Sequence, residues 1–269
     1  GCLLKYHIAD DRIQFVEGRD GPSNQSRLCV KGRYGFDYVH HPKRLKKPLI
    51  RRTGVGKTAA LLNAEDIDKT FREATWDEAL DVAANGLAAI RDKQGSNALA
   101  GFGSAKGSNE EAYLFQKLIR VAFGTNNVDH CTRLCHASSV AAMLETIGSG
   151  SVSNQVADVA QAEVIVIIGA KPTVNHPVAA TFMKNAVKDG KTLILMDPYR
   201  SDLARHADYF LQFRSDTDVP LLNGIMHAII EQDLHDRTYI ENHTEGFDDL
   251  AVAVAEYSPE KVAPICGIA

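Results

Sequence analysis

One apolar stretch, from Glu163 to Gly169, constrains the fold of this chain more than any other feature. Every residue between these two ends is β-branched, as is typical of a central strand in a parallel sheet that is covered on both faces. Similar runs follow at Thr192–Asp197 and Tyr209–Phe213, and residues 177–188 and 201–205 between them suit crossover helices. The sequence therefore predicts a Rossmann-like parallel sheet of the α/β class.

Two nucleotide-binding motifs are not expected. No Gly-x-Gly-x-x-Gly follows the first strand, which argues against NAD binding. Gly54–Thr58 imitates the end of a P-loop, but Arg51 stands where the first glycine is required and no hydrophobic strand precedes the motif. This region therefore favours a turn rather than a site for nucleotide hydrolysis.

A second α/β pattern precedes the predicted sheet. Thr75 and Glu78 form the pattern of a capping box, which predicts a helix from about Trp76 to Lys93. Residues 97–103 then read as a buried strand, and residues 108–121 as a second helix. The loop between them follows the carboxyl end of a strand, where α/β sheets commonly contact ligands.

Composition narrows the class of protein. The 269 residues carry a net charge of −4, which gives no general reason to expect nucleic acid as a partner. Five cysteines in a chain of this size do not resemble a secreted disulfide scaffold. Since no apolar run approaches the ~20 residues of a membrane span and no signal peptide is evident, we expect a cytoplasmic protein without a direct membrane span. A basic run between Lys31 and Arg52 is either a solvated face or attracts an anionic cofactor or partner.

The strongest functional signal is Cys135 followed directly by His136. A thiolate is a soft metal ligand, and an imidazole exchanges protons near neutral pH. Small residues from Ala137 onward predict the start of a helix, whose positive end would favour the thiolate. By itself, the pair is more commonly a buried structural cysteine beside a hydrogen-bonded histidine.

Several motifs along the chain place this pair in context. They are Cys29–Gly32 with Tyr34–Gly35, Trp76–Leu80, Gly124–Asn127, Cys135-His136, Ser153-Asn154, Asn175–Pro177, Asp197-Pro198 and Thr244–Phe247. Together they resemble the catalytic subunit of molybdopterin-dependent formate dehydrogenases, within the bis-pterin molybdenum or tungsten oxidoreductases. Many of these motifs are shared across that family, whereas cysteine or selenocysteine followed by histidine indicates formate. The resemblance implies an oxidoreductase that interconverts formate and carbon dioxide, with Cys135 as the metal ligand and His136 beside the substrate.

The resemblance also implies a [4Fe-4S] cluster in a small β-rich segment at the start of the chain. Cys2 falls where the third cluster ligand belongs and Cys29 where the fourth does, so the first two would lie before Gly1. Between these cysteines, residues 8–18 predict two short strands around an Asp-Asp turn. Lys31 matches the family lysine between cluster and pterin, where a cation would assist electron transfer.

The Rossmann-like sheet would hold one half of a bis(molybdopterin guanine dinucleotide) cofactor. Gly169 permits close approach to a phosphate, and Asn175 and His176 can donate hydrogen bonds to one. Asp197 would accept from ribose hydroxyls, and Asp218 matches the family carboxylate that recognises guanine, as the resemblance implies. The alternatives are a plain turn at Asp197-Pro198 and a charge at a helix N-terminus for Asp218.

The expected domains are residues 1–58, the incomplete iron–sulfur segment; residues 59–130, an α/β layer; and residues 131–269, the pterin-dinucleotide-binding layer. The chain reads as a segment of a longer enzyme, in which the arginine that pairs with formate and the second pterin site would follow Ala269. The segment alone would be inactive, and electrons would pass to subunits with iron–sulfur or flavin centres.

Two alternatives to the formate enzyme remain, a cysteine-ligated nitrate reductase-type enzyme and the metal-free large iron–sulfur subunit of NADH dehydrogenase. Cys131 is expected to be structural or incidental, Cys266 a buried small hydrophobe, and His227 an ordinary surface or core residue.

Overall fold

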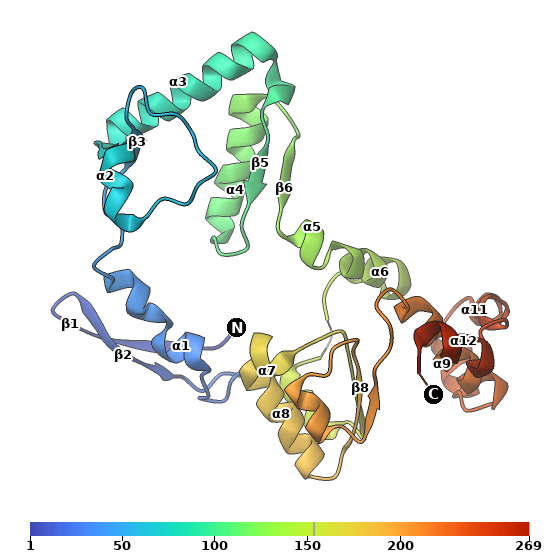
Figure 1. Ribbon diagram of the computed structural model, residues 1–269. Coiled ribbons are helices and arrows are strands. Elements are labelled where there is room, and N and C mark those ends of the chain that lie inside the picture. Colours follow the sequence, from blue (N-terminus) through green and yellow to red (C-terminus); the bar gives the residue numbers. More distant parts are fainter. Residues whose placement is uncertain (153, 269) are drawn as a thin grey trace. The chain divides into compact units, whose positions relative to one another are not determined.

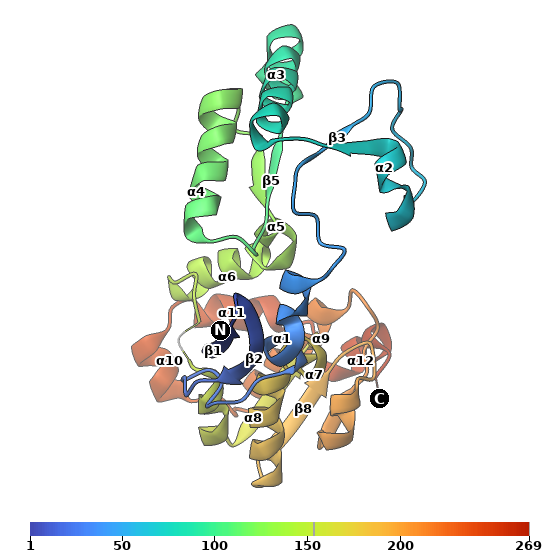
Figure 2. The same ribbon diagram turned by 90° about the vertical axis from the view of Figure 1, so that its left-hand side faces the viewer.

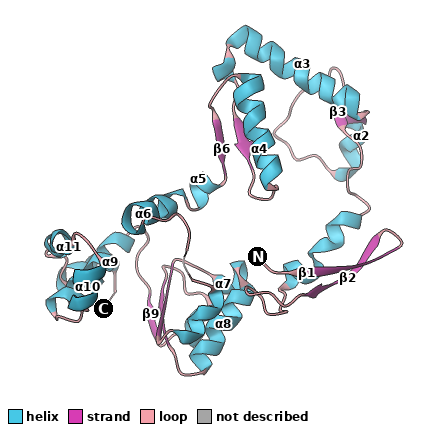
Figure 3. Cartoon of the chain, turned by 180° about the vertical axis from the view of Figure 1, so that it is seen from behind, coloured by secondary structure: helices cyan, strands magenta, loops and turns pink. Residues whose placement is uncertain are grey.

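The computed structural model describes residues 1–152 and 154–268, which form two compact units. The first unit joins residues 1–36 to residues 154–269, and the second spans residues 37–153. Figures 1, 2 and 3 show the elements of each unit from three sides. Ser153, which belongs to one of the motifs above, lies outside the described residues. The three domains expected from the sequence stay a prediction.

An antiparallel hairpin begins the first unit. Strands β1 (Leu4–Ala9) and β2 (Arg12–Gly18) pair along their length, with an irregularity after His7. Asp10 and Asp11 have φ angles of 50° and 54°, the left-handed conformation that tight hairpin turns need and that aspartate tolerates. The predicted pair of strands around an Asp-Asp turn is therefore confirmed. A loop then leads to the short helix α1 (Val30–Tyr34) and the 3-10 helix η1 (Gly35–His40).

A three-stranded parallel sheet forms the centre of the first unit, in the order β7-β8-β9. Its elements are the 3-10 helix η5 (Val156–Gln161), β7 (Val164–Ile168), α7 (Pro172–Asn175), α8 (Pro177–Lys188), β8 (Thr192–Met196), the 3-10 helix η6 (Asp202–His206) and β9 (Tyr209–Leu211). The crossover helix expected over residues 177–188 is confirmed as α8 (Figures 1 and 2). The second crossover is the 3-10 helix η6 rather than an α-helix.

The position expected for the first strand is wrong. β7 lies at the edge of the described sheet, and Val164 and Val166 are each 52% exposed, whereas Ile165 and Ile167 are buried. A run of β-branched residues reports a preference for extended backbone, but it does not report how many faces of the strand are covered. The buried face packs against Leu193 and the rest of one apolar cluster, which includes Leu195, Leu203, Ala186 and Ala204.

In the described part of the chain, four helices follow the sheet: α9 (Asp218–Glu231), α10 (Arg237–His243), α11 (Phe247–Val254) and α12 (Pro259–Cys266). A second buried cluster connects the sheet to them through Met196, Phe213, Leu221, Val262 and Cys266. Cys266 is fully buried, as expected of a structural cysteine. The imidazole Nδ1 of His227 lies 3.1 Å from the carbonyl oxygen of Val254 and connects α9 to the end of α11, which fits its expected place in the core.

The second unit contains two small strand pairs and several helices. Its elements are β3 (Leu49–Arg51), the 3-10 helix η2 (Ala64–Asp66), α2 (Ile67–Thr70), β4 (Phe71–Glu73), α3 (Trp76–Gln94), the 3-10 helix η3 (Ser96–Ala98), β5 (Gly101–Gly103), α4 (Asn109–Lys117), the π-helix η4 (Leu118–Phe123), β6 (Val128–His130), α5 (Thr132–Cys135) and α6 (Ala137–Ile147). β3 pairs with β4 in antiparallel fashion, and β5 pairs with β6 in parallel. Figure 3 shows α4 beside the β5–β6 pair.

Two predicted elements of this unit differ in extent. The helix expected from Trp76 is confirmed as α3, with Thr75 accepting a hydrogen bond from the backbone N–H of Glu78. The strand expected over residues 97–103 is only three residues long, because residues 96–98 first form a 3-10 turn after Gly95 (φ 86°). The helix expected over residues 108–121 changes from α to π geometry at Leu118.

Candidate cofactor-binding site

In the first unit, polar residues gather where β7 and β8 end. Gly169 follows β7 with a φ of 59°, and its N–H donates to the carbonyl oxygen of Met196 at 3.0 Å. No described atom beyond its chain neighbours lies within 4 Å of the place where a Cβ would stand. The backbone at Gly169 is therefore open to close approach by a ligand, as the sequence predicts.

Asp197 ends β8 and is buried, with its N–H donating to the carbonyl oxygen of Leu211 at 3.2 Å. Its Oδ1 accepts a hydrogen bond from the backbone N–H of Tyr199 at 2.7 Å. The carboxylate thus stabilises a turn, as one alternative from the sequence proposes, while its second oxygen keeps capacity to accept from a ligand hydroxyl.

Other side chains at this edge did not stand out in the sequence. The ammonium of Lys171 lies 3.5 Å from the ring centroid of Tyr199, so a cation is held above an aromatic face beside Gly169. Thr173 donates from its hydroxyl to Asp202 at 2.7 Å, and this hydrogen bond is the main cause that lowers the pKa of Asp202. The hydroxyl of Ser201 is buried without a hydrogen-bond partner among the described residues. These residues could have been selected from the sequence by the general rule that parallel sheets bind ligands at the carboxyl ends of their strands.

The remaining predicted contacts lie on exposed residues near this edge. Asn175 ends α7, His176 separates α7 from α8, and both are exposed. Asp218 is exposed in the first turn of α9, where a carboxylate also interacts favourably with the helix dipole.

The N-terminal segment that carries Cys29 meets this region directly. The Lys31 ammonium donates to the backbone carbonyl oxygen of Asn175 at 3.3 Å, although 144 positions separate the two residues in the chain. The guanidinium of Arg27 lies 5.1 Å from the centroid of the Phe182 ring on α8. The segment that carries Cys29 is therefore attached to the α7–α8 region at two points.

Cys29 occupies the N-cap position of α1 and is half-buried. The backbone N–H of Gly32 is the largest influence on its thiol and lowers the pKa, and the N–H and charge of Lys31 act in the same direction against the effect of burial. These interactions favour the thiolate, which is the form that binds iron. Cys2 is exposed.

In the second unit, Cys135 is the last residue of α5, and His136 connects α5 to α6. Both residues are exposed, so a buried structural cysteine does not describe this pair. The predicted helix of small residues is confirmed as α6, which begins at Ala137. Cys131 is also exposed, which is at odds with a structural role through burial, and its Sγ lies 3.8 Å from Nδ1 of His130.

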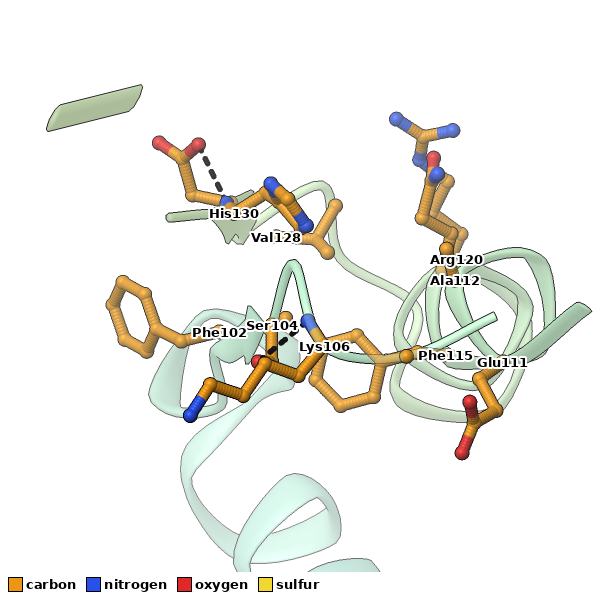
Figure 4. A pocket seen from close by; sticks show the side chains of 13 residues that line it. Phe102, Ser104, Lys106, Glu111, Ala112, Phe115, Arg120, Val128 and His130 are labelled. Carbon is orange, nitrogen blue, oxygen red and sulfur yellow. Dashed lines mark hydrogen bonds between the residues drawn. The ribbon is translucent and has the colours of Figure 1, made fainter. Parts of the chain in front are cut away.

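A pocket of about 600 Å³ lies at the carboxyl ends of β5 and β6 in the same unit. The loop that the sequence singles out, residues 103–107, forms one wall, and α4 and His130 contribute others (Figure 4). Lys106 and Arg120 line the pocket, as does Asp129, whose pKa is lowered first by the backbone N–H of His130 and then by Arg133. The dashed lines in Figure 4 mark the bonds from the N–H of Lys106 to Ser104 and from the N–H of His130 to Asp129.

Within residues 1–152 and 154–268, no group of three or more His, Cys, Asp or Glu side chains is arranged to hold a metal ion. The metal-ligand roles of Cys135, Cys2 and Cys29 stay predictions. No helix in the described part of the chain combines the length and apolar character needed to cross a membrane.

Two family models match consecutive parts of the chain. The family model described as molybdopterin oxidoreductase matches residues 44–256, and that described as the molybdopterin oxidoreductase Fe4S4 domain matches residues 1–41. The resemblance inferred from the motifs is thereby confirmed.

Curated relatives match over the whole chain. Formate dehydrogenase H of Escherichia coli K12 is 35% identical, and the alpha subunit of F420-dependent formate dehydrogenase of Methanocaldococcus jannaschii is 36% identical. This chain spans 36% and 37% of their respective lengths. Among solved structures, acetylene hydratase from Pelobacter acetylenicus matches all of this chain and 35% of its own, with a TM-score of 0.77 and 25% identity. The α/β class is confirmed, whereas the names of these proteins cover more than one reaction.

Proposed function

Because this chain belongs to the molybdopterin oxidoreductase family, we propose that it supplies the metal ligand and cluster ligands of an enzyme that interconverts formate and carbon dioxide. The observation that carries the proposal is the exposed Cys135-His136 pair between α5 and α6. Formate dehydrogenases that match along the whole chain support the choice of substrate.

The cofactors of the family are a pterin-bound molybdenum or tungsten and a [4Fe-4S] cluster. Donor chemistry in this chain fits both groups. The lowered pKa of Cys29 provides a thiolate for iron, and the open backbone at Gly169 leaves space for a phosphate. When bound, these groups supply the two-electron chemistry of the substrate and the one-electron steps that follow it.

The roles of the second unit follow from its two exposed residues. The Cys135 thiolate holds the metal. His136 lies beside the substrate, where an imidazole nitrogen can hold or release the proton set free when formate becomes carbon dioxide, one proton and two electrons.

The first unit holds the cluster and the dinucleotide. Cys2 and Cys29 would be two of the four cluster ligands, and Lys31 would provide a positive charge near the cluster. The hydrogen bond from Lys31 to the carbonyl oxygen of Asn175 supports this placement, because it connects the cluster segment to the α7–α8 region. Electrons leave for partner subunits with iron–sulfur or flavin centres.

Five residues contact the pterin dinucleotide in this proposal: Gly169, Asn175, His176, Asp197 and Asp218. Gly169, Asn175 and His176 would bind phosphate, Asp197 the ribose and Asp218 the guanine. The cation of Lys171, held over Tyr199, adds charge for the phosphates.

The proposal is tested in the full-length natural protein purified without oxygen. We expect near-stoichiometric molybdenum or tungsten and formate-dependent dye reduction without comparable nitrate reduction. Cys135→Ser should abolish this activity and keep iron, whereas the neighbouring exposed thiol variant Cys131→Ser should keep both. Normal turnover of formate by Cys135→Ser would refute the ligand assignment, and a preference for nitrate would refute the substrate.

A further inference from the structure

Asn24 is fully buried and its side chain binds three separate segments of the N-terminal region. Its Oδ1 accepts a hydrogen bond from the backbone N–H of Leu3 at 3.0 Å. Its amide nitrogen donates to the carbonyl oxygens of Arg19 and Arg27, both at 3.1 Å, and lies 3.4 Å from that of Leu3. One uncharged side chain therefore satisfies backbone groups before the hairpin, after it and ahead of α1.

The loop around Asn24 is shaped to hold this amide in place. The N–H of Asn24 donates to the carbonyl oxygen of Gly21 at 3.1 Å, and the N–H of Arg27 donates to the carbonyl oxygen of Asn24 at 2.8 Å. A Cβ at Gly21 would stand 2.8 Å from the side chain of Leu3 and 2.9 Å from Oδ1 of Asn24. Space beside the amide is therefore filled, and the side chain has one position available to it.

We propose that Asn24 is a positioning residue for the iron–sulfur cluster, an inference that rests on the proposed roles of Cys2 and Cys29. Leu3 directly follows Cys2, and Arg27 stands two residues before Cys29. Because the same amide binds the backbone next to both cysteines, it sets the separation of the two thiols. The N–H of Arg19, which donates to the carbonyl oxygen of Leu3 at 2.9 Å, braces the same connection.

This role has a chemical reason. Cys2 is exposed, and the backbone beside it is held at Leu3. The N–H of Leu3 donates to Asn24, and its carbonyl oxygen accepts from the N–H of Arg19. Without the amide, partly buried carbonyl oxygens of Arg19 and Arg27 lose their donor, and the loop must rearrange to satisfy them with water. The two thiolates would then no longer hold a fixed separation, and iron would dissociate more readily.

The test uses the full-length holoenzyme, purified without oxygen, and the variants Asn24→Ala, Asn24→Asp and Gly21→Ala. Asn24→Asp keeps the shape but replaces the donating NH₂ by an oxygen that faces the carbonyl oxygens of Arg19 and Arg27. Gly21→Ala keeps the amide and pushes on its Oδ1, so it provides a milder variant if the others do not fold. The control Val262→Ala removes buried methyl groups from the contact between α12 and α9 in the same compact unit.

Three properties of the cluster are measured: the rate of iron release to a chelator, the electron paramagnetic resonance spectrum and the midpoint potential. We expect both Asn24 variants to release iron at least about tenfold faster than the natural protein, with an altered spectrum and potential. Gly21→Ala should change these properties in the same direction but less. Val262→Ala should lower thermal stability and leave all three unchanged.

Unchanged iron release and spectrum in a folded Asn24→Ala or Gly21→Ala protein would overturn the inference, as would an equal effect in Val262→Ala. Cys29→Ser separates this failure from failure of the proposed function. If Cys29→Ser retains a normal cluster, the ligand assignment itself is wrong. If it loses the cluster while the Asn24 variants retain it unchanged, only the positioning role is wrong.

Discussion

Truncation of Leu195 to alanine should loosen the sheet that carries the proposed dinucleotide site. Leu195 is fully buried in the central strand β8, two residues before Asp197. The change removes three carbon atoms, for which the lost transfer free energy is about 2.4 kcal/mol at ~0.8 kcal/mol each. The cavity that remains raises the expected cost to about 3–4 kcal/mol.

The matched control is Val166→Ala in the neighbouring strand β7. Val166 is 52% exposed, so loss of its two methyl groups should cost only about 0.8 kcal/mol. Hydrogen exchange read by mass spectrometry is the suitable assay, because a protein with two compact units does not give a single free energy of unfolding. A cost of about 3 kcal/mol corresponds to roughly a hundredfold faster exchange in peptides that cover β7 and β8.

Two outcomes would refute this reasoning. If Leu195→Ala accelerates exchange by less than the control does, the core around β8 does not contribute the stability assigned to it. If Val166→Ala costs as much as Leu195→Ala in the full-length protein, the outer face of β7 is covered rather than open.

Two further predictions concern the cluster segment. Lys31→Met removes the cation that binds the carbonyl oxygen of Asn175. The midpoint potential of the cluster should then fall by on the order of tens of millivolts, because a nearby positive charge stabilises the reduced cluster. Lys31→Arg should largely retain the natural potential, and equal potentials in a redox titration of both variants would contradict the role of the charge. In the full-length protein without its cluster, the Cys29 thiol should be alkylated at lower pH than in the urea-unfolded chain, because the N–H of Gly32 lowers its pKa. The sign of this shift means that folding stability from Cys29 is complete above the unfolded pKa and is lost as pH falls through the folded one; an alkylation midpoint at or above that of the unfolded chain would show that the thiolate is not stabilised.

Much of the local structure could be predicted because local residue patterns determine it. The Asp-Asp turn, the start of α3 at its Thr75 cap and the whole of α8 follow from turn chemistry, capping and periodicity. The place of β7 at the sheet edge could not be predicted in this way, because strand order depends on contacts far apart in the chain.

The candidate site shows the same limit. Lys31 and Asn175 were each identified from motifs, but only the fold brings them together across 144 positions. Lys171 and Tyr199 come from different strand ends, and neither residue belongs to a pattern that signals their contact. Asn24 was overlooked because a single asparagine in a loop normally indicates a turn, whereas its importance here comes from burial and from side-chain hydrogen bonds to Leu3, Arg19 and Arg27.

The first compact unit is assembled from two stretches of chain, residues 1–36 and residues 154–269. During synthesis, the hairpin and the cysteine-bearing loop leave the ribosome before the α8 surface on which Arg27 packs. At typical rates of translation, the intervening residues 37–153 impose a delay on the order of ten seconds. Throughout that interval Cys2 and Cys29 belong to a nascent polypeptide without its docking surface, so at these proposed ligands we expect stable insertion of iron only after α8 has emerged and folded.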